Sequence, residues 1–111
     1  MTYDASEADW KVFRELREIA LERFCERVLD EVVRFRDDAS RSHHQRYLDL
    51  YRWIENRDEE LAAAFNDPRR SQMLWQLARI HGYGLLEPDE LARFTPPTRA
   101  AVDLIAKGLS R

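Results

Sequence analysis

Two adjacent histidines, His43 and His44, are the most obvious candidates for metal binding or proton transfer in this sequence. Helical metal motifs such as HExxH and Glu-x-x-His place two ligands on one face, whereas adjacent residues point about 100° apart. The residues three positions before His43, His44 and His81 are serine, arginine and alanine, so Glu-x-x-His is absent. A single cysteine, Cys25, excludes a thiolate zinc site. We therefore predict no metal site of these types and no cofactor.

The histidines could still bind a small ligand together with a nearby carboxylate. Projected at 100° per residue, Asp58 falls inside the apolar arc of a helix over 43–65, and both histidines fall at its margins. A buried carboxylate needs a partner. Asp58 is therefore expected to be buried and bonded to an arginine or tyrosine, or to act as a ligand-binding or catalytic acid. The full candidate set for ligand binding is His44, Asp58, His43, Tyr47 and Tyr51.

Acidic residues recur at intervals of four along the first predicted helix. They are Glu18, Glu22, Glu26 and Asp30. Residues four apart lie on one face of a helix, so the row forms a continuous negative stripe. The stripe is either an ordinary solvated surface or a docking surface for a basic protein partner.

The elements that carry these residues are all predicted to be helices. Apolar residues recur at intervals of three and four, and no segment alternates as a half-buried strand does. Ser6 can cap the first helix, Ser42 and Gln45 fit a capping box before the second, and Gly82 is a suitable stop for the third. We predict one all-α domain over 1–111, a helical bundle. Its two long helices cover about 6–36 and 43–65, and three short helices cover about 68–81, 88–94 and 96–108.

Composition narrows the functional classes. At 44% hydrophobic and 35% charged residues, the chain can form a core, and its net charge of −3 disfavours nucleic acid as a partner. A helix-turn-helix outline over 77–94 has a second helix that opens with Asp89 and Glu90, where phosphates would approach. The first residues are acidic and do not show the signal-peptide pattern, no apolar run is long enough to span a membrane, and Cys25 has no second cysteine to pair with, so we predict a cytoplasmic protein that makes no membrane contact.

The first predicted helix has a broad apolar stripe, wider than one neighbour would cover. We therefore expect a homodimer that forms through the first two helices. The leading interpretation is a bacterial-type, non-catalytic interaction or regulatory module. One alternative is a small-ligand or metal-binding protein, possibly an enzyme, that uses His43, His44 and Asp58. A less favoured alternative is a helix-turn-helix-like nucleic-acid binder.

Overall fold

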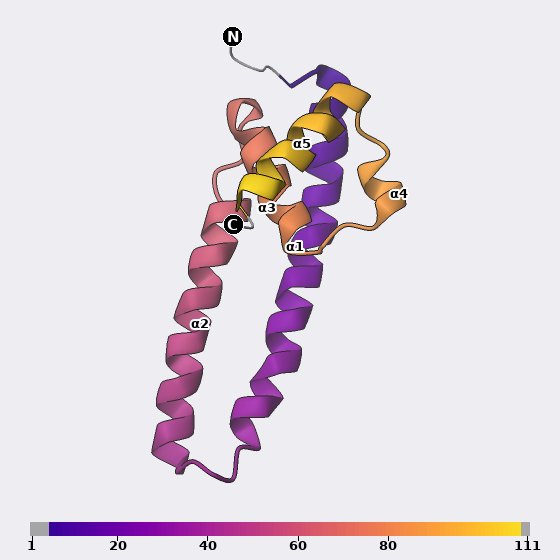
Figure 1. The fold of residues 1–111 in the computed structure, drawn as a ribbon. Coiled ribbons are helices and arrows are strands. Elements are labelled where there is room, and N and C mark those ends of the chain that lie inside the picture. Colours follow the sequence, from indigo (N-terminus) through magenta and orange to yellow (C-terminus); the bar gives the residue numbers. More distant parts are fainter. Residues whose placement is uncertain (1–4, 110–111) are drawn as a thin grey trace.

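The computed structural model describes residues 5–109, and this part of the chain is helical without a strand (Figure 1). The predicted all-α fold is confirmed. The helices are α1 (Glu7–Arg36), α2 (His43–Phe65), α3 (Met73–Gly82), α4 (Pro88–Leu91) and α5 (Pro96–Leu109), with a 3-10 turn at Arg70–Gln72. Helices α1 and α2 form a long antiparallel hairpin, and the shorter helices gather at one end of it.

Side-chain caps start both long helices where the sequence predicts them. The Ser6 hydroxyl accepts a hydrogen bond from the Asp9 amide at 3.1 Å. At the start of α2 the Ser42 hydroxyl accepts from the Gln45 amide at 3.1 Å, and the Gln45 side chain accepts from the Ser42 amide at 3.0 Å. These bonds satisfy backbone donors that a helix N-terminus otherwise leaves without partners.

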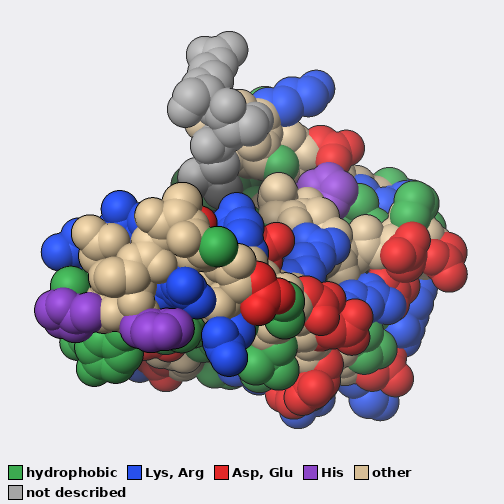
Figure 2. All heavy atoms as spheres, turned by 90° about the horizontal axis from the view of Figure 1, so that it is seen from below, with side chains coloured by type: hydrophobic (Ala, Val, Ile, Leu, Met, Phe, Trp, Pro, Cys, Tyr) green, Lys and Arg blue, Asp and Glu red, His purple; other side chains and the backbone are tan. Residues whose placement is uncertain are grey.

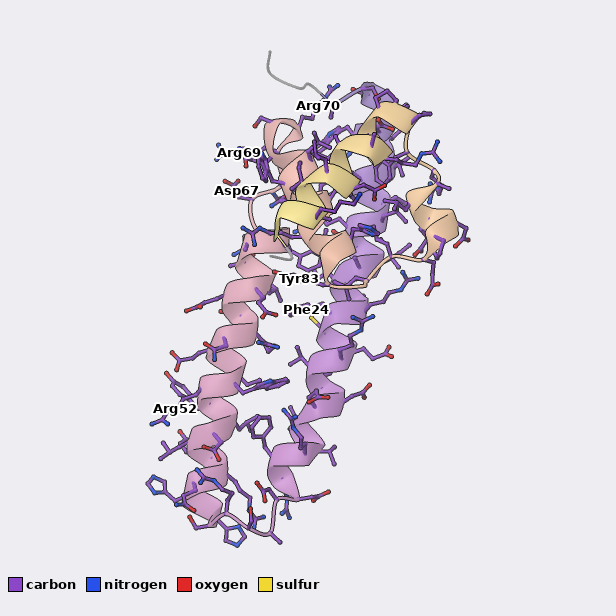
Figure 3. All side chains as sticks on the ribbon, viewed as in Figure 1. Phe24, Arg52, Asp67, Arg69, Arg70 and Tyr83 are labelled. Carbon is purple, nitrogen blue, oxygen red and sulfur yellow. The ribbon has the colours of Figure 1, made fainter. Side chains whose placement is uncertain are left out.

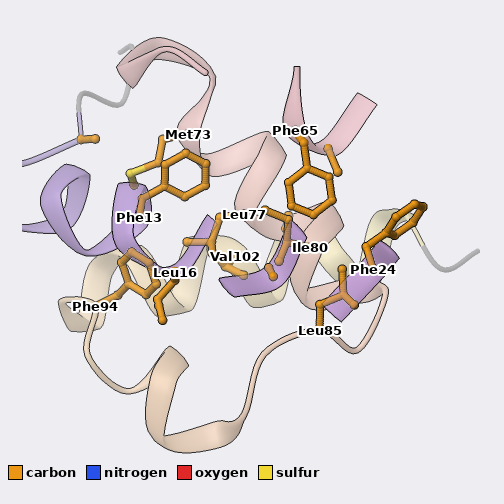
Figure 4. Close-up of a cluster of buried hydrophobic side chains, with 14 residues drawn as sticks. Phe13, Leu16, Phe24, Phe65, Met73, Leu77, Ile80, Leu85, Phe94 and Val102 are labelled. Carbon is orange, nitrogen blue, oxygen red and sulfur yellow. The ribbon is translucent and has the colours of Figure 1, made fainter. Parts of the chain in front are cut away.

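The hydrophobic core lies at the end of the hairpin where the short helices pack, which we call the head (residues 5–24 and 64–109). Figure 4 shows side chains from α1, α2, α3 and α5 meeting there, together with residues of the connecting loops. The large core residues are Phe13, Leu16, Phe24, Phe65, Met73, Leu77, Ile80, Leu85, Phe94 and Val102. The head thus contains the buried apolar surface that stabilises the fold.

The rest of the hairpin projects from the head as a two-helix arm (residues 25–63). The molecule measures 53 × 25 × 24 Å, and the arm accounts for its length. No residue of the arm is buried. Contacts between its helices include the rings of Phe35 and Trp53, whose centroids are 5.3 Å apart. Two packed helices cannot enclose side chains by themselves, which leaves much of the arm's apolar surface open to solvent.

A buried carboxylate joins the two ends of the chain inside the head. Asp9 is 1% exposed and accepts hydrogen bonds from the Thr95 amide (3.0 Å), the Thr95 hydroxyl (2.7 Å) and the Thr98 hydroxyl (2.6 Å). Burial by itself would raise the pKa of Asp9, but these hydrogen bonds from Thr95 and Thr98 hold the pKa below its ordinary value. Asp9 therefore serves as a long-range cap for α5, which the sequence analysis did not foresee.

The third helix begins later than predicted. Asp67 has a left-handed backbone (φ 52°), and its carboxylate pairs with Arg69 at 2.7 Å instead of capping a helix at position 68. Arg70 reaches across to α1, where its guanidinium donates to the Ala5 carbonyl at 2.7 Å and to Glu7 at 3.0 Å (Figure 3). These long-range bonds tie the start of the 3-10 turn to the N-terminal end of α1, and Met73 is the first residue of α3.

The fourth helix is shorter than the predicted range of 88–94: α4 begins at Pro88 and ends at Leu91. Its Glu90 carboxylate accepts from the Glu87 amide at 2.8 Å and from Arg23 on α1 at 2.6 Å. Hydrogen bonding to Arg23 is the main cause of a lowered pKa at Glu90. A single turn tied to α1 is too short to act as a recognition helix, which disfavours the helix-turn-helix alternative.

Candidate functional site

One side of the arm exposes a continuous set of apolar side chains, which we call the arm face. Its members are Cys25, Leu29 and Val33 from α1, and Tyr47, Tyr51 and Ile54 from α2. Spacings of three and four residues place each group in a row on its helix. Leu29 is 69% exposed, Val33 57%, Tyr47 65% and Tyr51 57%. Large apolar side chains gathered in this way are typical of a surface that another protein covers.

Two hollows lie along the arm face, one at each end. The hollow near the head has a volume of about 240 Å³, and that near the tip about 350 Å³. The first is lined by Phe24, Cys25, Val28, Leu29, Ile54, Arg57, Asp58 and Leu61. The second is lined by Val32, Phe35, Arg36, His43, Arg46, Tyr47 and Leu50. Each hollow draws on both helices, and the hollow near the head joins Cys25 and Leu29 of α1 to Ile54 of α2.

Charge is distributed unevenly around the arm face. The acidic row Glu18, Glu22, Glu26 and Asp30 borders it on α1, beside the exposed Leu29. Glu18 forms an ion pair with its neighbour Arg17 at 2.8 Å. Arg36, His43 and Arg46 lie at the tip. Figure 2, which looks onto the molecule from below and so toward the tip of the arm, shows acidic, basic and hydrophobic side chains interspersed on the side seen from there.

The five candidate ligand-binding residues do not form one site. His43 and His44 occupy the first turn of α2, as predicted from the capping box, but both are exposed and do not lie at the edge of a core. Asp58 follows fourteen residues after His44, about 21 Å farther along the helix. Tyr47 and Tyr51 lie between them on the arm face. Within residues 5–109 no three histidine, cysteine or acidic side chains are grouped so that they could hold a metal ion.

The prediction that Asp58 is buried is wrong. Asp58 is exposed at the rim of the hollow near the head, and it has no hydrogen-bond or ion-pair partner in the described part of the chain. The apolar arc of α2 is wider than the strip that α1 covers. Helix α1 packs against the side with Leu50, Trp53 and Leu61, which leaves Tyr51 open and Asp58 in solvent. Projecting the sequence of α2 onto a helix locates its apolar arc, but the projection does not show which part of that arc another helix covers.

The opposite side of the arm has a hollow of about 430 Å³ at its junction with the head, lined by both charged and apolar side chains. Arg57 lies over the Trp53 ring, 5.8 Å from its centroid, and pairs with Glu60 at 2.9 Å. Arg27 donates to the backbone carbonyls of Tyr83 (2.7 Å) and Gly84 (2.6 Å). Figure 3 shows Tyr83 close to Phe24, where the α3–α4 loop meets α1. Arg27 fastens the α3–α4 loop to α1, whereas both of these contacts of Arg57 lie within α2.

Comparison with known proteins supports the fold over nearly the whole chain. No protein-family model matches the sequence. The fluorescence recovery protein from Synechocystis sp. PCC 6803 has a similar structure, with a TM-score of 0.76 over 92% of this chain and 97% of that one. Their sequences are 18% identical, so the likeness concerns the fold alone.

Two curated relatives share sequence with part of the chain. They are the A-type inclusion protein A25 homologs of two camelpox virus strains, CP-1 and M-96. Each is 37% identical over 81 residues, which is 69% of this chain. The match spans only 11% of the viral proteins, so this chain corresponds to about a tenth of their length.

Within residues 5–109 no helix combines the length and apolar character that crossing a membrane requires.

Proposed function

We propose that this chain is a non-catalytic regulatory protein that acts by binding other protein chains, and that it forms a homodimer through the arm face. The observation that carries the proposal is an arm without a core: residues 25–63 include no buried side chain, yet Leu29, Val33, Tyr47 and Tyr51 are more than half exposed. Apolar surface in this arrangement gains free energy when a second protein covers it.

The fold likeness supports a regulatory role. The name of the fluorescence recovery protein describes an effect, the recovery of fluorescence, and no substrate. Its helical fold is similar to that of this chain. The candidate residues for a ligand site lie apart along α2, which favours an interaction role over catalysis. We extend the proposal to a cytoplasmic location, because the sequence has a single cysteine, which suits a reducing compartment.

The size of the arm face sets the expected strength of the dimer. From Cys25 to Arg36, α1 rises about 17 Å, and two packed helices are about 20 Å wide. The resulting footprint is on the order of 350 Å² per copy, below the roughly 800 Å² per partner of a standard interface. We therefore expect a dimer with a dissociation constant in the micromolar range, which a measurement at one low concentration would miss.

Sedimentation velocity from about 1 to 200 μM tests the proposal. The sedimenting mass should rise with concentration from 13.3 kDa toward twice that value. Leu29→Glu places a charge in the centre of the arm face and should leave the protein monomeric. Leu104→Glu is the matched control, because Leu104 is 75% exposed but lies on α5 in the head. A wild-type protein that stays monomeric throughout, or a Leu29→Glu variant that dimerises normally, would contradict dimerisation through this face.

A further inference from the structure

The hollow at the tip of the arm combines apolar walls with charged side chains of one sign. It has a volume of about 350 Å³ and lies between the C-terminal end of α1 and the N-terminal end of α2. Its apolar members Val32, Phe35 and Leu50 are half-buried, whereas the basic residues Arg36 and His43 are exposed. The junction hollow and the hollow near the head both include acidic side chains in their linings. The tip hollow therefore suits a molecule that has an apolar body and a negative group.

The third basic residue of this lining, Arg46, is fixed in place by the backbone around it. Its guanidinium donates hydrogen bonds to the carbonyls of Arg41 at 2.9 Å and Arg36 at 2.8 Å. Its Nη2 atom donates no hydrogen bond within residues 5–109. A guanidinium that is held in position and still has free N–H groups can bind a carboxylate with little further loss of conformational freedom.

Acidic side chains of the same chain do not neutralise the basic residues of the tip hollow at close range. The acidic residues of the tip are Asp37, Asp38 and Asp49, and none of them lines the hollow. Asp49 is already bonded to the guanidinium of Arg41, at 2.8 and 3.0 Å. The other two basic residues of the lining form no side-chain hydrogen bond or ion pair in the described part of the chain. Their charge is therefore available to a ligand.

We infer that the tip hollow binds a small amphipathic carboxylate, of the chemical class of a medium-chain fatty acid. The alkyl chain packs against Val32, Phe35 and Leu50, and the carboxylate binds at Arg36 and Arg46. Burying a methylene group strengthens binding by up to about fourfold, and an arginine fork is the side chain best matched to a carboxylate. The site is a further property of the chain and does not rest on the proposed dimer.

An NMR titration of the ¹⁵N-labelled Leu29→Glu variant with octanoate tests the site. Leu29 does not line the tip hollow, and its replacement keeps a second copy away from Tyr47, which belongs to both the hollow and the arm face. Octanoate should shift the amide signals of residues 32–36 and 43–50, with a dissociation constant between about 0.1 and 5 mM. No shift at about 5 mM, or shifts centred on the head or on the hollow near the head, would overturn the inference.

Two related probes separate the contributions of charge and of apolar contact. Octylammonium has the same alkyl chain with the opposite charge, and it should bind at least about tenfold more weakly than octanoate. Decanoate, with two more methylene groups, should bind about fivefold more tightly. Equal affinities for octanoate and octylammonium would overturn the role of the basic residues, and equal affinities for octanoate and decanoate would overturn the apolar contact.

Substitutions in the same Leu29→Glu background test the residues. Arg36→Gln should weaken octanoate binding about threefold to fivefold, and Arg36→Lys, which keeps the charge, should stay within about twofold. Arg52→Gln is the matched control, because Arg52 is an exposed arginine of α2 that points away from α1 and lies outside the hollow (Figure 3). Equal losses in Arg36→Gln and Arg52→Gln, or no loss in either, would overturn the assignment of the carboxylate to the tip hollow.

These outcomes are independent of those that test the dimer. If wild type stays monomeric at 200 μM but Leu29→Glu binds octanoate as described, the proposed dimer fails and the carboxylate site stands. If wild type dimerises and Leu29→Glu shows no response to octanoate, the site fails and the dimer stands.

Discussion

Asp9 provides the sharpest test of how the head is held together, and Asp9→Ala should destabilise the protein more than an ordinary helix cap does. The side chain is 1% exposed and accepts three hydrogen bonds, one from a backbone amide and two from threonine hydroxyls. Hydrogen bonds to a charged group each contribute about 1.5–3 kcal/mol, and buried donors left unpaired cost about 1–3 kcal/mol. Because these terms overlap, we expect the free energy of unfolding to fall by about 3–5 kcal/mol, against about 1 kcal/mol for an exposed cap.

Urea denaturation followed by circular dichroism measures this loss, at one protein concentration because dimerisation also stabilises the fold. Asp38→Ala is the matched control. The Asp38 carboxylate also accepts hydrogen bonds, from the amide (3.1 Å) and hydroxyl (2.5 Å) of Ser40, and its pKa is also lowered, chiefly by the Ser40 hydroxyl. Asp38 is exposed in the α1–α2 loop, so its replacement should change stability little. Equal effects of the two substitutions would refute the argument from burial.

The lowered pKa of Asp9 also predicts a pH dependence. An unfolded aspartate has a pKa of about 3.9, and the folded value lies below it. The carboxylate therefore contributes its full stabilisation above the unfolded pKa and loses it as the pH falls through the folded pKa. The stability difference between wild type and Asp9→Asn should be large at pH 7 and should shrink as the pH falls below about 4. A difference that stays constant down to pH 2.5 would show that the charge of Asp9 is irrelevant.

Two further predictions concern the α3–α4 connection. Gly84→Ala should destabilise the protein by about 1 kcal/mol in urea denaturation, because Gly84 has a left-handed backbone (φ 72°) that a Cβ atom disfavours. Gly82→Ala is the matched control: the position is helical with open space around the new Cβ, so the substitution should be neutral or stabilising. A larger loss of stability in Gly82→Ala than in Gly84→Ala would contradict the assignment of Gly84 as the turn residue. Arg23→Ala should lower the free energy of unfolding by about 1–2 kcal/mol, because the half-buried guanidinium binds Glu90 (2.6 Å) and the Leu85 carbonyl (2.9 Å). Arg34→Ala, which removes an exposed pair with Glu31 and a contact with the Phe35 ring, should stay within about 0.5 kcal/mol of wild type in the same denaturation assay, and equal losses would refute the role of burial.

The helices could be predicted because their signals are local. Ser6 bonds to an amide three residues away, and the Ser42–Gln45 box spans the same distance, so a short sequence window contains the whole interaction. The apolar periodicity likewise depends only on neighbouring turns. Helix starts that depend on distant contacts were missed: Arg70 is bonded to the N-terminal end of α1, and α3 begins at Met73 instead of position 68.

The candidate site could be predicted only in part. The sequence located Tyr47 and Tyr51 on the apolar side of α2 and the acidic row on α1, and it suggested pairing through these helices, which stays a proposal. It could not show that Asp58 is exposed, since the apolar arc of α2 fits either a neighbour in the same chain or a second protein.

Local chemistry along the chain thus accounts for which segments are helical, how α1 and α2 begin and which residues share a face. Packing between distant segments accounts for the rest: the core is confined to the head, Asp9 caps a helix that lies 86 residues away, and the arm face is left uncovered. The physical reason is the separation along the chain of the residues that each kind of interaction joins. A helix is stabilised by bonds within four residues, whereas burial depends on which surfaces the whole chain brings together.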